Sequence, residues 1–515
     1  MRTICIPHTE LPGTSTLFGD YLYRFSKVSA FYDHNPHEAD SLRRVAAALR
    51  HPDSRRQQVA DALRKLNGES AALAQLELPD TVAVVTGQQV GLFGGPAYTI
   101  YKALTAAKLA QLLTKAGIRA VPVFWLATED HDFEEIKSVQ VFDASTRPLR
   151  LAADGERQAN QPAGSVPMTA PPLGSLAEAF RGFLHGDDVV ALVEEAYQPG
   201  RTFGEAFRLL LKRLLSGYGI VFLDPMMPEI RAIAAPLLKS AFERRDELSA
   251  AVRARGKDLE AAGYHAQVLF EERSSFFFWH QGGRRLPLPA GENGARILAE
   301  PENLSPNALL RPVMQDYILP TAAYVGGPAE IAYLAQSQPL YRALLGRMPV
   351  AVARSGFTLL DERAHMLMDK HHISLLDCFH GEAALRDRIA SRLVPEDLHI
   401  GFEDTLSDVR NAVDRLLGPI ERFDPTLGAA WQKSRAKILY QIEKNRKKTA
   451  REALRRETQV AAAASHLANL VYPNHHLQER AYSILPFLAR HGLDLIDTLY
   501  DKLHDGCPDH LVATI

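Results

Sequence analysis

The first half of the chain alternates between apolar runs and amphipathic stretches, in an order typical of a parallel sheet. Residues 1–75 are polar with apolar positions at helical spacing, which predicts helices. Residues 81–87 and 121–127 predict buried strands, and residues 97–117 predict the helix between them. Strand, turn, helix and strand form a βαβ unit with a right-handed crossover. Ligands of open α/β sheets bind outside the carboxyl ends of the strands, so polar residues at those ends are candidates for a site.

Further apolar runs extend this unit to a larger core. Residues 219–225 and 348–356 predict short strands, and residues 266–288 predict an antiparallel hairpin around a Gly-Gly turn. Segments of weaker periodicity interrupt the core and predict inserts. We therefore expect an N-terminal helical segment and an α/β core, at 1–75 and 76–395, with inserts near 140–215 and 257–300.

After residue 396 the pattern changes to that of long helices. Apolar residues recur at spacings of 3, 4, 3 and 4, which is a heptad seam. They are Leu406, Val409, Val413, Leu416 and Ile420. The segment PTLG (425–428) could turn the chain, and a long basic helix follows it. We predict an α-helical coiled-coil hairpin over 396–465 and a C-terminal segment over 466–515 that packs on the core; dimerisation through the hairpin is a hypothesis.

Composition narrows the class of protein. A chain of 515 residues is too long for one compact core, since single cores stop growing at about 250–300 residues. The 59 basic and 61 acidic residues leave a net charge of -2, so nothing indicates nucleic acid or a membrane surface as a partner. Neither a membrane span nor a signal peptide is predicted. Cys5, Cys378 and Cys507 are far apart, so we expect reduced thiols and a cytoplasmic protein.

The segment VVTGQQVGLFGGPAYTIYKALT (84–105) carries the first candidate site. Its glycines lie between a strand and a helix, where backbone N–H groups favour an anion and glycine permits close approach. The spacing is neither GxGxxG nor that of a P-loop. A tight turn without a ligand is the alternative, although the neighbouring polar residues favour a pocket. The candidates are Gly87, Gln88, Gln89, Gly94, Gly95, Tyr98 and Lys102.

The segment ATEDHDFEEI (127–136) places four ionisable residues at the end of the second strand. They are Glu129, Asp130, His131 and Asp132. Such a group can orient a histidine, bind an amino group or hold a divalent metal. The alternative is a charged loop in which Asp132 caps a short helix. Adjacent side chains cannot all face one cavity, so we expect some of the four to line it.

The segment SPNALLRPVMQDYILPTAAYVGGPAEIAYLAQ (305–336) is the third candidate. Its polar residues are Asn307, Arg311, Gln315, Asp316 and Glu330. The first three are four residues apart and would share a helix face, unless Pro312 ends the helix near Arg311. Arg311 could bind a carboxylate or phosphate through two hydrogen bonds. The alternative is that Glu330 caps a helix and Arg311 is merely exposed.

Several familiar motifs are absent from the sequence. There is no HExxH motif, no Cys/His zinc pattern and no GxSxG nucleophile elbow. The histidine pairs at 371–372 and 475–476 have a spacing poorly suited to one helical metal face. We therefore predict no metal site.

Four segments of the chain resemble those of a known family. TGQQVGLFGGPAYTIYKA, PVFWLATEDHDFEEI, SPNALLRPVMQDYILPTAAYVGGPAEIAYLAQ and YPNHHLQER are similar to segments of the bacterial cysteine ligases that complete bacillithiol biosynthesis. The resemblance covers nearly the whole chain. It implies a Rossmann-like, nucleotide-binding core related to class I aminoacyl-tRNA synthetases, with connecting-peptide inserts, a coiled-coil hairpin and a homodimer. It also implies the substrates, L-cysteine and glucosaminyl-malate.

The resemblance implies a mechanism as well. The carboxylate of cysteine would attack ATP to give cysteinyl-adenylate, which the amine of the glucosamine would then attack, with catalysis mainly by positioning and charge stabilisation. Lys102 and the glycine turn, with Gly94 and Gly95, would bind phosphate. The acidic group would hold an amino group, His131 would accept a proton, and Arg311 would hold malate or a phosphate. The HxGH and KMSKS signatures of the synthetases are absent, so the manner of ATP binding stays open.

Two other classes of function stay open. One is an enzyme that condenses the same substrates without ATP or takes cysteine from an activated donor. The other is a non-catalytic scaffold whose working part is the coiled coil. Three polar segments at strand ends argue against a scaffold, because a scaffold needs no such clustered pocket.

Overall fold

The computed structural model describes residues 2–38, 40–155, 157–289, 291–292, 294–392, 394–456, 458–503 and 508–515. The chain divides into two compact units. The first is Met1–Thr358 with Glu479–Ala513, and the second is Leu359–Gln478 with Thr514–Ile515. Cys507 lies outside the described residues. Within the described part of the chain, no helix combines the length and the apolar character that a membrane crossing requires.

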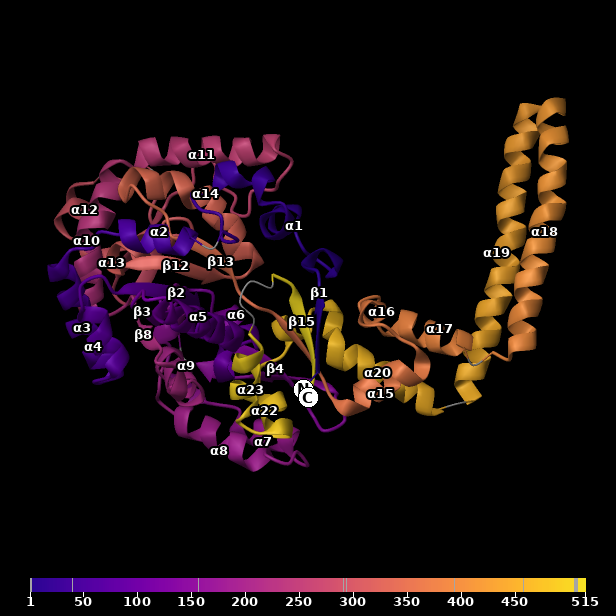
Figure 1. Cartoon of the computed structure of the whole chain (residues 1–515), viewed down its shortest axis with the longest axis horizontal. Coiled ribbons are helices and arrows are strands. Elements are labelled where there is room, and N and C mark those ends of the chain that lie inside the picture. Colours follow the sequence, from indigo (N-terminus) through magenta and orange to yellow (C-terminus); the bar gives the residue numbers. More distant parts are fainter. Residues whose placement is uncertain are drawn as a thin grey trace. The chain divides into compact units, whose positions relative to one another are not determined.

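A five-stranded parallel sheet forms the core of the first unit (Figure 1). In spatial order its strands are β13 (Val350–Ala353), β12 (Thr321–Gly326), β2 (Val82–Gln88), β3 (Ala120–Leu126) and β8 (Val221–Leu223). Every residue of β3 and β12 is buried, as expected for parallel strands covered on both faces. The chain adds strands to one side of β2 and then to the other, so the order reverses between β2 and β12. This confirms the predicted Rossmann-like core and locates its switch point.

Helices cover both faces of this sheet. On one face, Ala106 and Ala110 pack against Val82 and Val84, and the small alanine side chains allow the helix to lie close to the strands. The helices of that face are α2 (Ser41–Ala48) and α5 (Tyr98–Lys115). Helices on the other face contribute to a larger core cluster, and they are α3 (Asp53–Asn67), α4 (Ala71–Glu77), α10 (Pro228–Glu243), α13 (Arg311–Ile318) and α14 (Pro328–Leu344).

The segment between β3 and β8 contains two hairpins and several helices. Thr202 and Glu205 form a capping box at the start of its longest helix, α9, which then buries its apolar face. The elements are α6 (Phe133–Ile136), β4 (Ser138–Phe142), β5 (Pro148–Ala152), β6 (Asp154–Gly155), β7 (Met168–Ala170), α7 (Leu173–Phe180), α8 (Gly186–Ala196) and α9 (Phe203–Leu214).

The segment between α10 and β12 carries the predicted Gly-Gly hairpin. Gly282 and Gly283 both have positive φ, and the strands on either side of them pair antiparallel, which confirms that prediction. A third short strand pairs with the first strand of the hairpin. The elements are α11 (Arg245–Ala261), β9 (Phe277–Gln281), β10 (Arg284–Pro287), α12 (Ala295–Ala299) and β11 (Leu304–Pro306).

The two ends of the chain meet in a second sheet. Strand β15 (His510–Thr514) lies between β1 (Arg2–Ile6) and β14 (Phe357–Leu360). The prediction of helices alone for residues 1–75 is therefore wrong at its start, because a strand whose partner lies at the other end of the chain leaves no local signal. The remaining elements of this unit are α1 (Thr16–Tyr23), α21 (Gln478–Ala481), α22 (Leu485–His491) and α23 (Leu495–Lys502).

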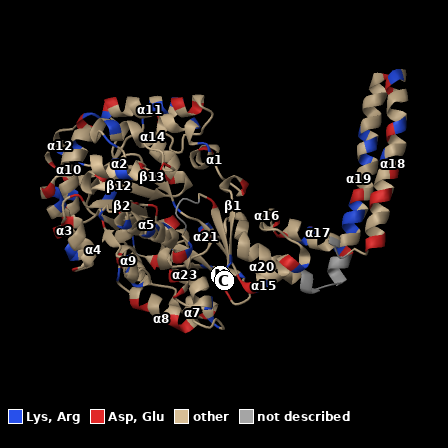
Figure 2. Ribbon diagram, viewed as in Figure 1, with Lys and Arg blue, Asp and Glu red and all other residues tan. Residues whose placement is uncertain are grey.

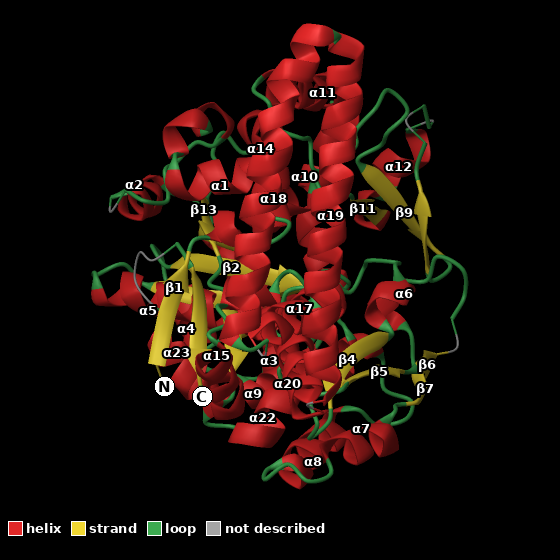
Figure 3. Ribbon diagram, turned by 90° about the vertical axis from the view of Figure 1, so that its right-hand side faces the viewer, coloured by secondary structure: helices red, strands yellow, loops and turns green. Residues whose placement is uncertain are grey.

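The second unit is helical and contains the predicted coiled-coil hairpin, whose two long helices lie side by side (Figures 1 and 3). Leu406 and Val413 of the predicted seam are buried, whereas Leu416 is 49% exposed. Lys and Arg recur along α19 (Figure 2). The helices are α15 (Glu362–His371), α16 (Leu375–Cys378), α17 (Glu382–Arg392), α18 (Glu396–Phe423), α19 (Pro425–Arg456) and α20 (Thr458–Val471).

The turn of the hairpin lies one residue before the predicted PTLG segment. Helix α18 ends at Phe423, Asp424 makes the turn, and α19 begins at Pro425. The Asp424 carboxylate accepts hydrogen bonds from the backbone N–H groups of Thr426 and Leu427, at 2.6 and 3.3 Å. Proline is well suited to the first position of a helix, so PTLG begins the second helix and does not form the turn.

Candidate active site

A cavity of about 320 Å³ opens at the carboxyl ends of β2, β3 and β12, at the switch point of the sheet. Helices α5 and α14 both begin beside it, at Tyr98 and Pro328, so two helix N-termini add positive potential there. The structure brings nine of the sequence-predicted residues to its wall. They are Gly87, Gln88, Gln89, Tyr98, Lys102, Asp130, Arg311, Gln315 and Glu330.

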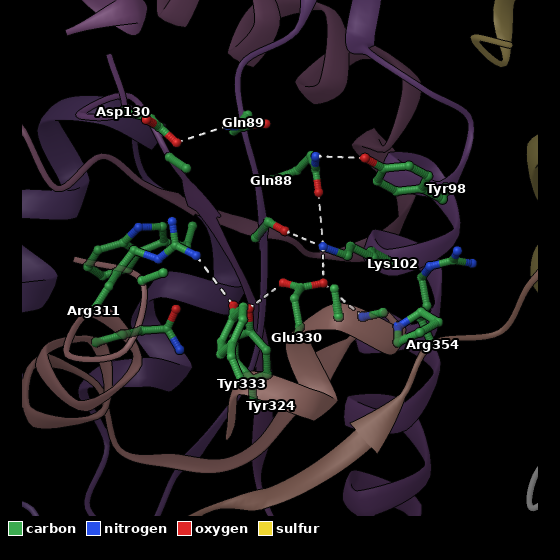
Figure 4. A pocket seen from close by; sticks show the side chains of 18 of the residues that line it. Gln88, Gln89, Tyr98, Lys102, Asp130, Arg311, Tyr324, Glu330, Tyr333 and Arg354 are labelled. Atoms are coloured by element: carbon green, nitrogen blue, oxygen red, sulfur yellow. Dashed lines mark hydrogen bonds and ion pairs between the residues drawn. The ribbon is translucent and has the colours of Figure 1, made fainter. Parts of the chain in front are cut away.

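Lys102 and Glu330 form a buried ion pair within this cavity wall (Figure 4). Lys102 is only 3% exposed, and its ammonium also donates to the Gly87 carbonyl and to Gln88 Oε1, both at 2.9 Å. Burial lowers the pKa of Lys102, and the carboxylate of Glu330 partly offsets that effect. An ammonium has three donors, so each donor of Lys102 has a protein acceptor in this arrangement.

The carboxylate of Glu330 accepts hydrogen bonds from three groups. Besides Lys102, the Tyr324 hydroxyl donates to Oε1 at 2.6 Å and the Gly327 N–H donates to Oε2 at 2.8 Å. Burial raises the pKa of Glu330, but Lys102 and the Gly327 N–H outweigh burial and leave the pKa below its usual value. Glu330 therefore caps α14, as the simpler interpretation of the sequence held, and also holds Lys102 and Tyr324 in place.

Arg311 lies on the opposite side of this ion pair from Arg354 (Figure 4). Its Nη2 donates to the Tyr333 hydroxyl at 3.3 Å, and among the described residues it has no carboxylate within ion-pair distance. A guanidinium that is half-buried without a carboxylate is suited to an anionic ligand. The alternative that Pro312 ends a helix near Arg311 is wrong, because α13 begins there with Pro312 in its first turn. The predicted shared helix face holds for Arg311 and Gln315 but not for Asn307, which precedes the helix.

Two carboxylates face the cavity from the end of β3. Gln89 Nε2 donates to Asp130 Oδ2 and to Glu135 Oε2, both at 2.9 Å, and so holds the two side chains together. Burial raises the pKa of Asp130, but the Gln89 hydrogen bond and the charges of Arg285 and Arg311 outweigh burial and lower it. Asp130 is therefore ionised at neutral pH and can bind an ammonium group.

The other ionisable residues of that segment lie outside the cavity wall. Asp132 caps α6 by accepting from the Glu135 N–H at 3.3 Å, as the alternative interpretation held. Glu129 is 3% exposed and accepts from the Ser305 hydroxyl at 2.7 Å. Arg285 of the inserted hairpin reaches His131, with 3.1 Å between Nη1 and Nδ1. Because arginine only donates, His131 accepts at Nδ1 and carries its proton on Nε2.

These contacts make up a second polar cluster, which we call the hairpin cluster. Its members are Glu129, His131, Arg231, His280, Arg285 and Ser305. Arg285 is 6% exposed and donates to Ser305 Oγ and to the Pro306 carbonyl, both at 2.8 Å. It also lies 3.8 Å from the centre of the Phe278 ring. The cluster joins the inserted hairpin to the end of β3.

Four further predicted residues do not line the cavity. The Gly94 N–H donates to the Tyr197 hydroxyl at 3.2 Å and the Gly95 N–H to the Leu92 carbonyl at 3.0 Å, so neither amide is free for a phosphate in this arrangement. Asn307 Oδ1 accepts from two backbone N–H groups at the turn before α13. Asp316 is fully buried and accepts from the Tyr341 hydroxyl. The binding roles predicted for these four residues stay predictions.

Close packing accounts for the glycine at the end of β2. A Cβ added at Gly87 would lie 2.8 Å from the Trp125 carbonyl oxygen and 2.9 Å from its Cβ. Gly87 pairs with Trp125 in the parallel ladder, so only a residue without a side chain fits there. The packing of β2 against β3 therefore requires a glycine at this position, although Gly87 also lines the cavity.

Among the cavity-wall residues that were not predicted from the sequence, five carry an ionisable side chain. They are Glu135, Tyr324, Tyr333, Arg354 and Arg480. Arg354 directly follows β13, so the rule that polar residues at strand ends mark a site would have found it. The two tyrosines look like ordinary core residues in the sequence. Arg480 comes from a distant segment. It is the last residue of YPNHHLQER, so the resemblance of that segment to the family is the signal that could have found it.

Comparison with known families identifies the chain. The family described as "Bacillithiol biosynthesis BshC, N-terminal Rossmann-like domain" matches residues 1–355, and "Bacillithiol biosynthesis BshC, C-terminal coiled-coil domain" matches residues 357–515. A protein of Solibacter usitatus named "Putative cysteine ligase BshC" is 48% identical over 100% of both chains. Proteins with the same name from Koribacter versatilis and Salinibacter ruber are 37% and 30% identical, and each comparison covers at least 98% of both chains. The chain therefore belongs to the BshC family of bacillithiol biosynthesis.

Proposed function

We propose that this protein is a ligase that forms the amide bond between L-cysteine and the amino group of glucosaminyl-malate. The names of its relatives support the ligase class and the use of cysteine. The observation that carries the proposal is the composition of the cavity wall. The unpaired guanidinium of Arg311 and the carboxylates of Asp130 and Glu135 face one space, so the cavity suits molecules with both a carboxylate and an amino group.

The volume of the cavity is small for a ligand-binding site. About 320 Å³ is near the lower end of the range of about 300–1,000 Å³ for small-molecule sites. Both substrates carry an amine and at least one carboxylate. We infer that Asp130 binds the amino group of a substrate and that Arg311 binds a carboxylate or a phosphate.

The proposed reaction has two steps. The cysteine carboxylate attacks the α-phosphate of ATP, which forms cysteinyl-adenylate and releases pyrophosphate. The amine of the glucosamine then attacks the acyl carbon, the amide bond forms, and AMP leaves with the bonding electrons of the acyl–phosphate bond. The amine loses a proton in this step, and we infer that one of the two carboxylates held by Gln89, that of Asp130 or that of Glu135, accepts it. Arg311 and the two helix N-termini stabilise the negative charge that develops.

Lys102 has a supporting part in this proposal. Its three donors already contact Gly87, Gln88 and Glu330, so it reaches a phosphate only by giving up one of them. We infer that Lys102 holds the end of β2 against α14 and adds positive potential to the cavity. The family signatures that hold ATP in class I synthetases are absent, and Glu330 already caps α14, so we infer that phosphate binding falls to Arg311 and the N-terminus of α5.

The deciding experiment follows product and nucleotide together. The full chain is incubated with cysteine, glucosaminyl-malate and ATP, and the amide product, AMP and pyrophosphate are measured over time. Equal amounts of the three support the proposal. Product without nucleotide consumption favours the condensing enzyme that works without ATP, and absence of product under all conditions favours the scaffold. Arg181→Ala is a matched control, because Arg181 is an exposed arginine that pairs with Glu178 away from the cavity wall.

A further inference from the structure

The short helix α21 brings two adjacent charged residues to the cavity from the C-terminal part of the chain. Arg480 lines the cavity and is exposed, and among the described residues no carboxylate lies within ion-pair distance of it. Glu479, its neighbour, is 3% exposed and points into the protein, where it contacts Arg354. Helix α21 thus places the guanidinium of Arg480 at the cavity and the carboxylate of Glu479 behind the cavity wall.

The contact between Arg354 and Glu479 is bidentate. Nη1 of Arg354 donates to Oε2 at 2.9 Å, and Nη2 donates to Oε1 at 2.5 Å. Oε2 also accepts from the Phe357 N–H at 3.1 Å. Burial raises the pKa of Glu479, but Arg354 outweighs burial and lowers it to about 2. A fork-to-fork pair of this kind fixes the orientation of the guanidinium as well as its charge.

The backbone around the pair leaves no room for it to shift. A Cβ added at Gly356 would lie 2.9 Å from Glu479 Oε2 and 2.7 Å from His510 Nδ1. His510 is fully buried, and its Nε2 lies 2.8 Å from the Thr358 hydroxyl. The glycine therefore allows the C-terminal strand and α21 to close onto Arg354. We take this packing as the reason that Arg354 has a defined position.

Both arginines face the same aromatic ring. The guanidinium carbons of Arg354 and Arg480 lie 5.2 and 5.7 Å from the centre of the Tyr98 ring. Lys102 lies 5.8 Å from the same centre. Of the three cations, Lys102 and Arg354 have carboxylate partners, in Glu330 and Glu479. The charge of Arg480 is left without one, so this end of the cavity has an excess of positive charge that an anion would neutralise.

We propose that Arg354, Arg480 and Tyr98 form an oxyanion subsite at the end of the cavity away from Arg311, and that Glu479 is a positioning residue that holds this subsite together. The ligand group is a carboxylate or a phosphate, since both match the planar donor pattern of arginine. The identity of that group rests on the proposed function, because glucosaminyl-malate carries carboxylates and ATP carries phosphates. The existence of the subsite does not rest on it.

The test measures binding without turnover. L-malate and inorganic pyrophosphate are titrated separately into the full chain by calorimetry, for the wild type and for Arg480→Ala, Arg480→Lys, Glu479→Gln and Arg181→Ala. We expect Arg480→Ala to weaken binding of one probe by about 10–100-fold and Arg480→Lys to restore part of it, because charge is kept and the fork is lost. A loss with malate identifies a carboxylate subsite, and a loss with pyrophosphate identifies a phosphate subsite. Arg181→Ala should bind as the wild type does.

Glu479 is tested by variants that leave Arg480 intact. Glu479→Gln should weaken the same probe by about tenfold or more, because Arg354 loses its fixed orientation. Where that variant does not fold, Glu479→Asp keeps the charge but withdraws the carboxylate by one methylene, and it should weaken binding while lowering the melting temperature less than Glu479→Gln does. In turnover, Arg480→Ala should raise the KM of the substrate whose oxyanion it binds and leave kcat within about threefold.

Two results would overturn the proposal. If the wild type binds neither probe, or Arg480→Ala binds both as the wild type does, there is no subsite at this position. If folded Glu479 variants bind both probes normally, Glu479 has no positioning role. A chain that shows the expected binding but forms no product from cysteine and glucosaminyl-malate would refute only the proposed function.

Discussion

Two polar clusters lie at the carboxyl edge of the same sheet, and they differ in what their charges contact. In the cavity, Lys102 and Glu330 are paired, but Arg311 faces open space. In the hairpin cluster, Arg285 directs its donors to a hydroxyl, a carbonyl and an imidazole, and no cavity separates these groups. Both clusters are rich in the residue types that sequence reasoning associates with catalysis.

The difference shows that residue type and strand-end position are not sufficient to identify a site. Glu129 and His131 satisfy both criteria, yet the partner of His131 is Arg285 of the inserted hairpin and the partner of Glu129 is Ser305 of β11. Asp130, between them, faces the cavity. What distinguishes the cavity is a charge, that of Arg311, for which the described part of the chain supplies no carboxylate partner. We therefore expect variants in the cavity to affect turnover most and variants in the hairpin cluster to affect stability most.

Glu330→Gln should have the largest effect. It removes the anion that holds Lys102 and weakens the contacts of Tyr324 and Gly327. Breaking a buried pair costs about 3–5 kcal/mol, and misplacing the groups around a reaction centre by about 1 Å lowers turnover about 10²-fold. Product formation by the soluble fraction and chemical denaturation would measure the two effects.

The double variant Lys102→Met/Glu330→Leu separates the effect on stability from the effect on turnover. Replacing both charges by apolar side chains should recover most of the lost stability, because no unpaired charge remains, while activity stays low. A double variant with wild-type turnover would show that the ion pair has only a structural role and would remove the contrast between the two clusters.

Arg311→Ala should have the next largest effect, confined to activity. Losing a charged hydrogen bond to a ligand costs about 10–100-fold in KM. Stability should change by less than about 1 kcal/mol, because the guanidinium has no ionic partner among the described residues to leave behind. Steady-state kinetics with each substrate varied in turn would show which one Arg311 binds. An unchanged KM for every substrate, with a normal fold, would contradict its assignment as the anion-binding group.

The fold was largely predictable, and about half of the cavity wall was. The apolar runs at 81–87 and 121–127 and the glycine turns placed Asp130 at a strand end and Lys102 on the helix that follows the first strand, where the structure has them. The seam of the coiled coil was visible for the same reason, since the signal is local. Arg480 was not predictable from the local pattern, because its position depends on packing between α21 and Arg354, far apart in the chain. The inward direction of Glu129 likewise depends on Ser305 and Arg231, which are far from it in the chain.

Arg285→Ala should lower stability more than turnover. It removes the group that joins the hairpin to Ser305, Pro306 and His131, and it leaves buried acceptors without donors, at a cost of about 2–4 kcal/mol. Assayed well below its unfolding temperature, the variant should keep turnover within about tenfold.

His131→Gln should likewise keep turnover within about tenfold, since His131 lies outside the cavity wall. A much larger loss for either folded variant would make the hairpin cluster part of the catalytic machinery.

The smallest expected effect is a pH dependence of stability that arises in the hairpin cluster. Burial, together with the charges of Arg231 and Arg285, lowers the pKa of His280 from 6.5 to about 3. The unfolded chain then binds a proton at this residue below pH 6.5 and the folded chain does not, so stability is full above pH 6.5 and falls as the pH drops towards 3. Between pH 7 and pH 5 the loss from His280 should be about 1–2 kcal/mol.

Fluorescence can isolate this contribution. In a Trp431→Phe background the two remaining tryptophans, Trp125 and Trp279, both lie in the first unit. Guanidinium unfolding at pH 7 and pH 5 then reports that unit, and His280→Gln should lose less stability between the two pH values than its parent does. Equal losses in both proteins would mean that His280 does not stay neutral in the folded chain beside Arg231 and Arg285, and that the pH dependence of stability arises elsewhere.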